Sequence, residues 1–211
     1  MAVVTISRQY GAGGRHVAAA VARALGFRAV DRELVEEAAR RIGMDPEVAR
    51  SRDERVPALI EEVGLALASA SPPFVGAPLP QLAPGLLDDR ALAEATRTVI
   101  ESLADAGGYV ILGRGGQAAL GDRPDAFHVA LVADPKDRVR RVMDHEGLDE
   151  REARQRCRSV DAERAAYVRR YYGVDIRDPL LYDLVVNTSR LGLEGAAELV
   201  VAAARRKLRL A

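Results

Sequence analysis

The sequence predicts a three-layer α/β domain in which a parallel β-sheet is covered by helices on both faces. Apolar, β-branched runs alternate with longer helical segments along the chain. These runs are apolar at consecutive positions, as expected for strands buried on both faces of a parallel sheet. With 211 residues, 48% of them hydrophobic, the chain is long enough for one domain with a buried core, or for one domain with a small inserted lobe.

Each predicted strand is a short apolar run bounded by turn residues. The five runs cover residues 3–6, 27–30, 109–112, 127–133 and 184–187. Capping residues, prolines and glycines mark most of the helix ends between them. The predicted helices cover residues 17–25, 32–42, 88–106 and 193–208, and others start at Asp45-Pro46, at Asp134-Pro135 and at the capping-box pattern Asp149–Glu152, the last running toward Tyr172.

One segment differs from the rest in composition. Residues 71–86 hold five of the ten prolines. A long loop and the edge of a mobile lobe are both compatible with this composition.

Charge and cysteine content exclude several functional classes. The 31 basic and 31 acidic side chains give a formal net charge of +0, which argues against a general nucleic-acid or membrane-surface binder. A single cysteine, Cys157, excludes an intramolecular disulfide and a multi-cysteine metal site, and we interpret it as structural. His128, in an apolar run, is expected to be a core or edge histidine. With neither a membrane-spanning run nor a signal-peptide pattern, the expected location is the cytoplasm.

The turn after the first strand has the composition of a phosphate site. It reads Arg8-Gln9-Tyr10-Gly11-Ala12-Gly13-Gly14-Arg15-His16. Glycines allow successive backbone N–H groups to point inward, and the following helix adds its positive N-terminal end. The standard phosphate-loop pattern has Gly, Lys and Ser or Thr where this chain has Gln9, Arg15 and His16. A tight turn that binds no ligand is the alternative interpretation.

The segment Ile6–Arg15 closely resembles the opening of the cytidylate kinase-like family, a bacterial branch of the P-loop nucleoside monophosphate kinases whose members also carry Arg in place of the usual Lys. The resemblance covers essentially the whole chain and is least specific over residues 50–105. Further segments that match the family are Val30–Leu34, Gly113-Arg114-Gly115, Asp161–Arg164, Tyr171–Gly173, Asp178-Pro179 and Tyr182–Ser189.

The resemblance implies a phosphotransferase that uses ATP and Mg²⁺ and phosphorylates a nucleoside monophosphate, most simply CMP or dCMP. It implies a small-molecule nucleotide as the partner, with no nucleic acid, membrane or obligatory protein partner and no metal held by the protein's own residues. The residues expected to hold the ATP phosphates are Gly11, Ala12, Gly13, Gly14, Arg15 and His16. The expected acceptor-binding residues are Asp31, Arg114, Asp161 and Arg164, and the expected catalytic arginines are Arg15, Arg154 and Arg158.

The residues themselves support these roles and also allow simpler ones. Arg114 follows a strand, at the edge where open α/β sheets bind ligands, and its planar guanidinium suits a phosphate; a surface salt bridge is the alternative. The arginines of residues 151–164 form either a mobile lid or a solvated helix face. Asp161 and Arg164, three residues apart on one helix face, form either a base-reading pair or an ion pair. Asp31 is either an N-cap or a residue that orients Mg²⁺ or the acceptor.

The expected organisation is a single P-loop kinase-like domain over residues 1–211. Its core covers about 1–30, 107–147 and 180–211, an acceptor lobe covers about 31–106, and an arginine-rich lid covers about 148–179. Two other functions remain open: a P-loop kinase with another acceptor, and a nucleotide-binding regulatory protein with little turnover. His16 and the absence of an acidic residue from the strand at 109–112 favour the last of these.

Overall fold

The structure is a computed structural model that describes residues 2–31 and 89–210. The chain divides into two compact units, one formed by residues 1–30 and 100–211 and the other by residues 31–99. The second unit is described only at Asp31 and over residues 89–99. The helices predicted over residues 32–42 and from Asp45, and the proline-rich segment 71–86, lie outside the described residues.

The first unit is built on a five-stranded sheet in which every pair of neighbouring strands is parallel. The strand order is β2-β3-β1-β4-β5, so β1 lies at the centre. The strands are β1 (Val3–Arg8), β2 (Arg28–Val30), β3 (Tyr109–Leu112), β4 (Ala126–Val132) and β5 (Leu184–Asn187). All five strands were predicted from the sequence, and the parallel sheet confirms the predicted fold class.

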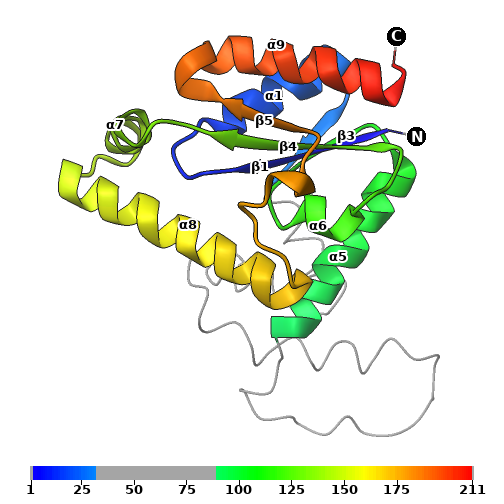
Figure 1. The fold of residues 1–211 in the computed structure, drawn as a ribbon, viewed down its shortest axis with the longest axis horizontal. Coiled ribbons are helices and arrows are strands. Elements are labelled where there is room, and N and C mark those ends of the chain that lie inside the picture. The colour runs from blue at the N-terminus through cyan, green and yellow to red at the C-terminus, as the bar shows by residue number, and fades with distance from the viewer. Residues whose placement is uncertain (1, 32–88, 211) are drawn as a thin grey trace, which may run out of the picture. The chain divides into compact units, whose positions relative to one another are not determined.

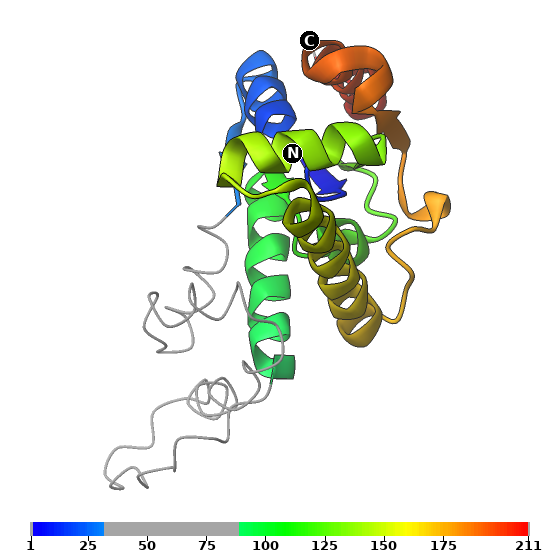
Figure 2. The same cartoon turned by 90° about the vertical axis from the view of Figure 1, so that its left-hand side faces the viewer.

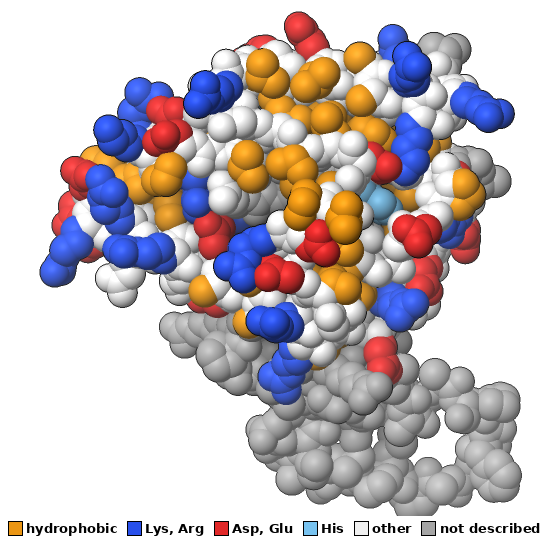
Figure 3. All heavy atoms as spheres, viewed as in Figure 1, with side chains coloured by type: hydrophobic (Ala, Val, Ile, Leu, Met, Phe, Trp, Pro, Cys, Tyr) orange, Lys and Arg blue, Asp and Glu red, His pale blue; other side chains and the backbone are white. Residues whose placement is uncertain are grey.

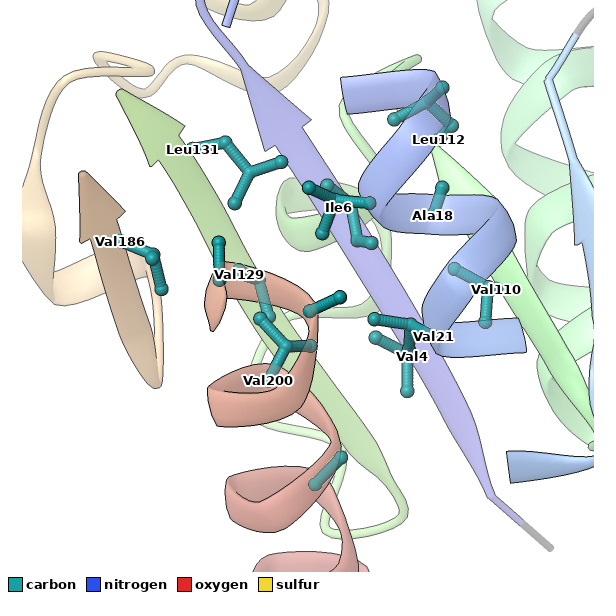
Figure 4. Close-up of a cluster of buried hydrophobic side chains, with 14 of the residues drawn as sticks. Val4, Ile6, Ala18, Val21, Val110, Leu112, Val129, Leu131, Val186 and Val200 are labelled. Atoms are coloured by element: carbon teal, nitrogen blue, oxygen red, sulfur yellow. The ribbon is translucent and has the colours of Figure 1, made fainter. Parts of the chain in front are cut away.

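Helices α1 (Gly14–Leu25) and α9 (Thr188–Leu208) cover one face of this sheet (Figure 1). The apolar side chains of that face, among them Ile6 and Val129, point toward the two helices and form the largest buried cluster (Figure 4). The short helix α6 (Gly116–Leu120) packs on the opposite face, where Gly116 lies against Thr5. The sheet is therefore buried on both faces, as its consecutive apolar residues predict.

Helices α7 (Pro135–Glu146) and α8 (Glu150–Tyr172) pack against each other, and α7 lies in front of the carboxyl ends of the strands (Figure 2). Both begin at predicted caps. The Asp134 side chain accepts a hydrogen bond from the backbone N–H of Lys136, at 2.9 Å. Asp149 and Glu152 form the reciprocal capping box. These caps set where each helix starts and so position the residues that α7 and α8 present to the sheet edge.

Some elements differ from the sequence prediction. Helix α1 starts at Gly14, three residues earlier than predicted, because Gly13 adopts the left-handed conformation of its N-cap. Helix α9 starts at Thr188 and bends at Gly192, whose ψ of 173° is not helical. Helix α6 and the 3₁₀ turn η1 (Pro179–Leu181) were not predicted, because five and three residues are too few to show a helical period.

Helix α5 (Asp89–Ala106) agrees with its prediction and contributes residues to both units. Across residues 2–31 and 89–210, no helix combines the length and the apolar character needed to cross a bilayer.

His128 is a buried core histidine, as its place in an apolar run predicts. Its Nδ1 lies 2.7 Å from the Thr5 hydroxyl and its Nε2 lies 2.8 Å from the carbonyl oxygen of Gly121. Because a carbonyl oxygen only accepts, Nε2 carries the proton and Nδ1 accepts from the hydroxyl. Burial lowers the pKa of the imidazole.

Candidate functional site

Two glycine-rich turns meet at the carboxyl edge of the sheet, where the neighbouring strands β1 and β3 end. The first turn comprises residues 9–13 and the second turn residues 113–115. The backbone N–H of Gly113 donates to the Ile6 carbonyl, at 2.9 Å. The Arg8 side chain lies between the turns, so close that a Cβ on Gly113 would stand 1.9 Å from its Nη1 and one on Gly14 would stand 2.8 Å from its Cγ. The sheet thus brings together the two segments that the sequence marks as phosphate-binding.

The first turn leads directly into a helix end that has no side-chain capping hydrogen bond. Gly13 is the N-cap of α1 and makes no side-chain capping bond, and the first turn of α1 holds no acidic residue. Gly11 has a φ of 75°, and a Cβ there would stand 2.6 Å from the carbonyl oxygen of Arg138. The N–H groups and the positive dipole end at the start of a 12-residue helix favour an anion.

Helices α7 and α8 hold the peptide groups on both sides of Tyr10. The Arg138 Nε donates to the Tyr10 carbonyl, at 2.6 Å, and the Tyr10 N–H donates to Oδ1 of Asp161, at 2.7 Å. The Arg138 Nη2 donates to Oδ2 of Asp161, which closes a ring of three interactions. The side chains of Arg138 and Asp161 are 10% and 29% exposed.

Residues of α9 and α7 contact the end of the first turn, and a residue after β4 contacts its start. The Thr188 hydroxyl, which is fully buried, donates to the carbonyl of Ala12, at 3.0 Å. The Arg141 Nη1 donates to the Gly11 carbonyl, at 3.2 Å, and lies 3.3 Å from the same hydroxyl. Gln9, where the standard pattern has glycine, accepts a hydrogen bond through its Oε1 from the N–H of Ala133, at 3.1 Å.

Two arginines of α8 flank the ring of Tyr10. Arg164 and Arg156 place their guanidinium carbons 5.3 and 5.7 Å from the ring centroid. Arg164 also donates to the carbonyl of Arg8, at 3.0 Å. The Tyr10 hydroxyl donates to Glu146, and burial together with this carboxylate raises the pKa of the phenol.

The second turn is shaped by its own backbone. Gly113, Arg114 and Gly115 have φ values of 82°, 57° and 68°, so three successive residues are left-handed. For Arg114 this conformation is unusual and costs about 1–2 kcal/mol. The Tyr172 hydroxyl donates to the Arg114 carbonyl across a long 3.4 Å. The half-buried Arg114 lies two residues after the end of β3, at the carboxyl edge of the sheet.

The structure groups the predicted site residues unevenly. Residues 11–13 form the end of the first turn, Gly14 begins α1, and Arg15 and His16 are exposed at the start of this helix. The His16 Nε2 lies 2.9 Å from Oε1 of Glu194. Asp31 follows β2 and belongs to the second unit.

On α8, Asp161 and Arg164 contact the first turn. Arg154 and Arg158 are exposed and make no hydrogen bond or ion pair with that turn; Arg154 pairs with Glu150. Basic and acidic side chains lie intermixed over the side of the molecule formed by α7 and α8 (Figure 3). Within the described ranges, no group of three or more His, Cys, Asp or Glu side chains could hold a metal ion.

Local sequence patterns do not reveal the contacts of Gln9, Tyr10, Thr188, Arg138 and Arg141. The partners in these contacts are 47 to 176 positions apart in the sequence. The sequence carries one weak sign of these contacts: Arg138 and Arg141 occur at i, i+3 on the helix that follows β4.

Comparison with known protein families and curated sequences gives one extended match and two partial ones. The family described as "Cytidylate kinase-like family" matches residues 3–190. A uronate isomerase from Corynebacterium glutamicum is 34% identical over 53% of this chain and 21% of its own length. A cytidylate kinase from Natronomonas pharaonis is 31% identical over 54% of this chain and 58% of its own length. The aligned segments thus span less than two thirds of either relative.

Solved structures show the same fold at low sequence identity. An uncharacterised protein from Eubacterium ventriosum has a TM-score of 0.67 and 19% identity, with 97% of this chain and 98% of that chain covered. A gluconokinase from Sinorhizobium meliloti has a TM-score of 0.57 and 14% identity, covering 99% and 94%. A shikimate kinase from Bacteroides thetaiotaomicron has a TM-score of 0.53 and 16% identity, covering 99% of both chains. The fold is that of the P-loop kinases.

Proposed function

The chain belongs to the cytidylate kinase-like family, and we propose that it transfers a phosphoryl group from ATP to a nucleoside monophosphate, with CMP or dCMP as the acceptor. The observation that carries this proposal is the meeting of the two glycine-rich turns at the ends of β1 and β3. Phosphoryl transfer requires two phosphate-bearing molecules in line, and adjacent strand ends can hold one each.

The first turn would hold the donor. Its N–H groups from Gly11 to Arg15 and the positive end of α1 suit the β-phosphate, where negative charge builds up as the bond to the γ-phosphate breaks. The exposed Arg15 side chain adds the charge that Lys supplies in the standard pattern. His16, the last residue predicted here, stands beside this end of the helix.

The second turn would hold the acceptor phosphate through Arg114. Arg114 lies on a turn of three left-handed residues, which sets where its side chain leaves the backbone at the edge of the sheet. A planar fork of N–H donors binds two phosphate oxygens at once. Asp31, Asp161 and Arg164 remain proposed acceptor residues, although Asp161 and Arg164 contact the first turn in this structure.

Charge stabilisation during transfer would come from arginines. Arg154 and Arg158 remain the proposed catalytic groups of α8, and their exposed positions require α8 or the ligand to shift before they touch a phosphate. The family implies Mg²⁺ bound with ATP. The described residues do not fit a dedicated Mg²⁺ site, because position 16 offers an imidazole paired with Glu194 in place of a hydroxyl. The groups with which this chain would stabilise charge during transfer are therefore its arginines and its backbone N–H groups.

The decisive experiment is an acceptor panel. Purified protein is incubated with ATP, MgCl₂ and one of CMP, dCMP, UMP, AMP, GMP, shikimate or gluconate, and ADP release is compared with an acceptor-free control. We expect the highest kcat/KM with CMP or dCMP. Turnover with gluconate or shikimate alone would assign the chain to a small-molecule kinase of another class.

A second candidate function is a nucleotide-binding protein with little turnover. The observation that favours it is the imidazole at position 16, which lies 2.9 Å from Glu194 and offers no hydroxyl to bind Mg²⁺ with the phosphates. ATP binding by calorimetry without ADP release across the whole panel would establish this function in place of the kinase.

A further inference from the structure

We propose that Arg138 and Asp161 are positioning residues that fix the first turn for the donor phosphates by clamping both peptide groups of Tyr10. The clamp itself rests on observed contacts. Its effect on donor binding rests on the proposed function. It assigns to Asp161 a role other than reading the base of the acceptor.

The clamp constrains one residue from both sides. Asp161 holds the Tyr10 N–H, Arg138 holds the Tyr10 carbonyl, and the two side chains hold each other. Fixing the N–H and the C=O of one residue fixes the orientation of the two peptide planes that flank it. The second of these planes leads into Gly11, which itself lies against the backbone of Arg138. The direction of the N–H groups in the rest of the turn follows from this anchor.

The chemistry of the pair makes it poorly suited to bind a substrate directly. Each carboxylate oxygen of Asp161 already accepts a hydrogen bond, one from Tyr10 and one from Arg138. If the carboxylate turned toward a base, it would have to give up the Tyr10 N–H or the guanidinium of Arg138, whose side chain is 10% exposed. Losing one partner of a buried pair is costly, because the remaining charge stays desolvated.

The clamp also joins elements that are distant in sequence. Arg138 comes from α7 and Asp161 from α8, and both reach a turn near the N-terminus. Preorganised N–H groups stabilise phosphate charge only when their directions are set in advance. Loosening Tyr10 should therefore weaken donor binding, while Arg114 on the second turn keeps its backbone geometry.

The first test needs no nucleotide. Hydrogen exchange is measured on ligand-free wild type, on Asp161→Asn, on Arg138→Lys and on the control Asp144→Asn, an exposed residue of α7. Asp161→Asn keeps the shape of the side chain but removes its charge, and Arg138→Lys keeps the charge but cannot hold Tyr10 and Asp161 with a planar fork. We expect faster exchange in the peptide over residues 9–14 in both clamp variants and no change in the control. Unchanged exchange in both would overturn the clamp.

The second test separates a positioning role from a base-reading role. Calorimetry with ATP and initial rates with varied CMP and AMP are compared for the same proteins, after thermal unfolding shows that each is folded. For the clamp variants we expect ATP affinity to fall by about tenfold, with the KM for CMP and the preference for CMP over AMP kept. A lost preference for CMP with unchanged ATP affinity would make Asp161 a base reader and overturn the inference.

Failure of the proposed function gives a different pattern. If wild-type protein binds ATP but phosphorylates none of the acceptors, the kinase proposal fails while the exchange and ATP-binding results still decide the clamp. If wild type does not bind ATP, the donor role of the clamp is overturned together with the proposed function.

Discussion

The two glycine-rich turns follow neighbouring strands and are held by different parts of the chain. The first turn is contacted by side chains of α7, α8 and α9, and its own Gln9 accepts from the backbone after β4. The second turn has three consecutive left-handed residues, and the side chains of Arg8 and Tyr172 lie against Gly113 and Gly115. The turn proposed for the donor thus depends on the packing of α7, and the turn proposed for the acceptor depends on Arg8 and on the end of α8.

This difference matches the work that each turn would do. A triphosphate needs several N–H groups aimed at once, and distant anchors can set each of them separately. A monophosphate needs one well-placed guanidinium, which a single arginine on a turn can supply. We therefore expect substitutions in α7 to affect the first turn and to leave the second turn unchanged.

The largest effect is expected where the backbone of the first turn touches α7. Gly11→Ala adds a Cβ that would stand 2.6 Å from the Arg138 carbonyl oxygen, so the turn must shift. A displacement of this kind costs about 100-fold in turnover. Gly26→Ala is the matched control: φ is also positive, at 67°, but no atom lies within 4 Å of the new Cβ.

The comparison is made by initial rates and by urea unfolding. Gly26→Ala should lower the unfolding free energy by about 1–2 kcal/mol, the cost of the left-handed conformation, and keep wild-type turnover. Equal turnover in the two variants would show that contact with α7 does not shape the first turn.

A smaller effect is expected at the second turn. Arg114→Ala should weaken binding of the monophosphate acceptor by about 1.5–3 kcal/mol, the contribution of a charged hydrogen-bonding group. Arg114→Lys should restore only part of this binding free energy, because an ammonium cannot form the planar fork. Calorimetry with CMP measures both variants, and Arg140→Ala, at an exposed arginine of α7, is the control. Unchanged CMP affinity in Arg114→Ala would make this residue structural.

Stability is expected to depend on Thr188. Thr188→Val keeps the shape of the side chain but leaves the Ala12 carbonyl without its buried donor, which costs about 1–3 kcal/mol in unfolding free energy. Thr188→Ser keeps the hydroxyl and should lose less. Urea denaturation of the three proteins tests this order, and a serine variant as unstable as the valine variant would show that the methyl group, not the hydrogen bond, matters.

The smallest effect concerns pH and lies away from both turns. The pKa of His128 is lower in the folded protein than its usual value of 6.5, so the unfolded chain binds the proton more readily. Stability from this residue is therefore complete above pH 6.5 and falls as the pH drops from 6.5 toward the folded-state pKa.

Thermal unfolding at several pH values checks this dependence. Between neutral and mildly acidic pH, His128→Gln should lose less stability than wild type. His145→Gln, at an exposed site, should lose as much as wild type. Identical pH profiles for wild type and His128→Gln would contradict the assignment of a neutral buried imidazole.

The sequence predicts the features that depend on neighbouring residues, and it does not predict the contacts between residues that are far apart along the chain. Strands, caps and the two turns are local patterns, so the sheet, the Asp149 capping box and the place of Arg114 were all predicted. The short helix α6 has too few residues to show a period. The contacts of Arg138 and Thr188 with the first turn join residues more than 100 positions apart, and only the folded sheet brings them together.

The same limit applies to the α8 arginines. Their density in the sequence predicts a basic segment, but the choice among them depends on which helix face meets the sheet. Asp161 and Arg164 face the first turn, and Arg154 and Arg158 are exposed. The functional roles of all four remain predictions that the acceptor panel and the clamp variants address.

The most direct test of the account is the effect of Arg15 on ATP. Wild type, Arg15→Ala and Arg15→Lys are titrated with ATP and with CMP by calorimetry and assayed for turnover. If the first turn holds the donor phosphates, Arg15→Ala abolishes turnover and weakens ATP binding more than CMP binding, while Arg15→Lys, which keeps the charge at the start of α1, retains measurable activity. An Arg15→Ala protein with wild-type ATP affinity and activity would contradict the account and leave the first turn as a packing element.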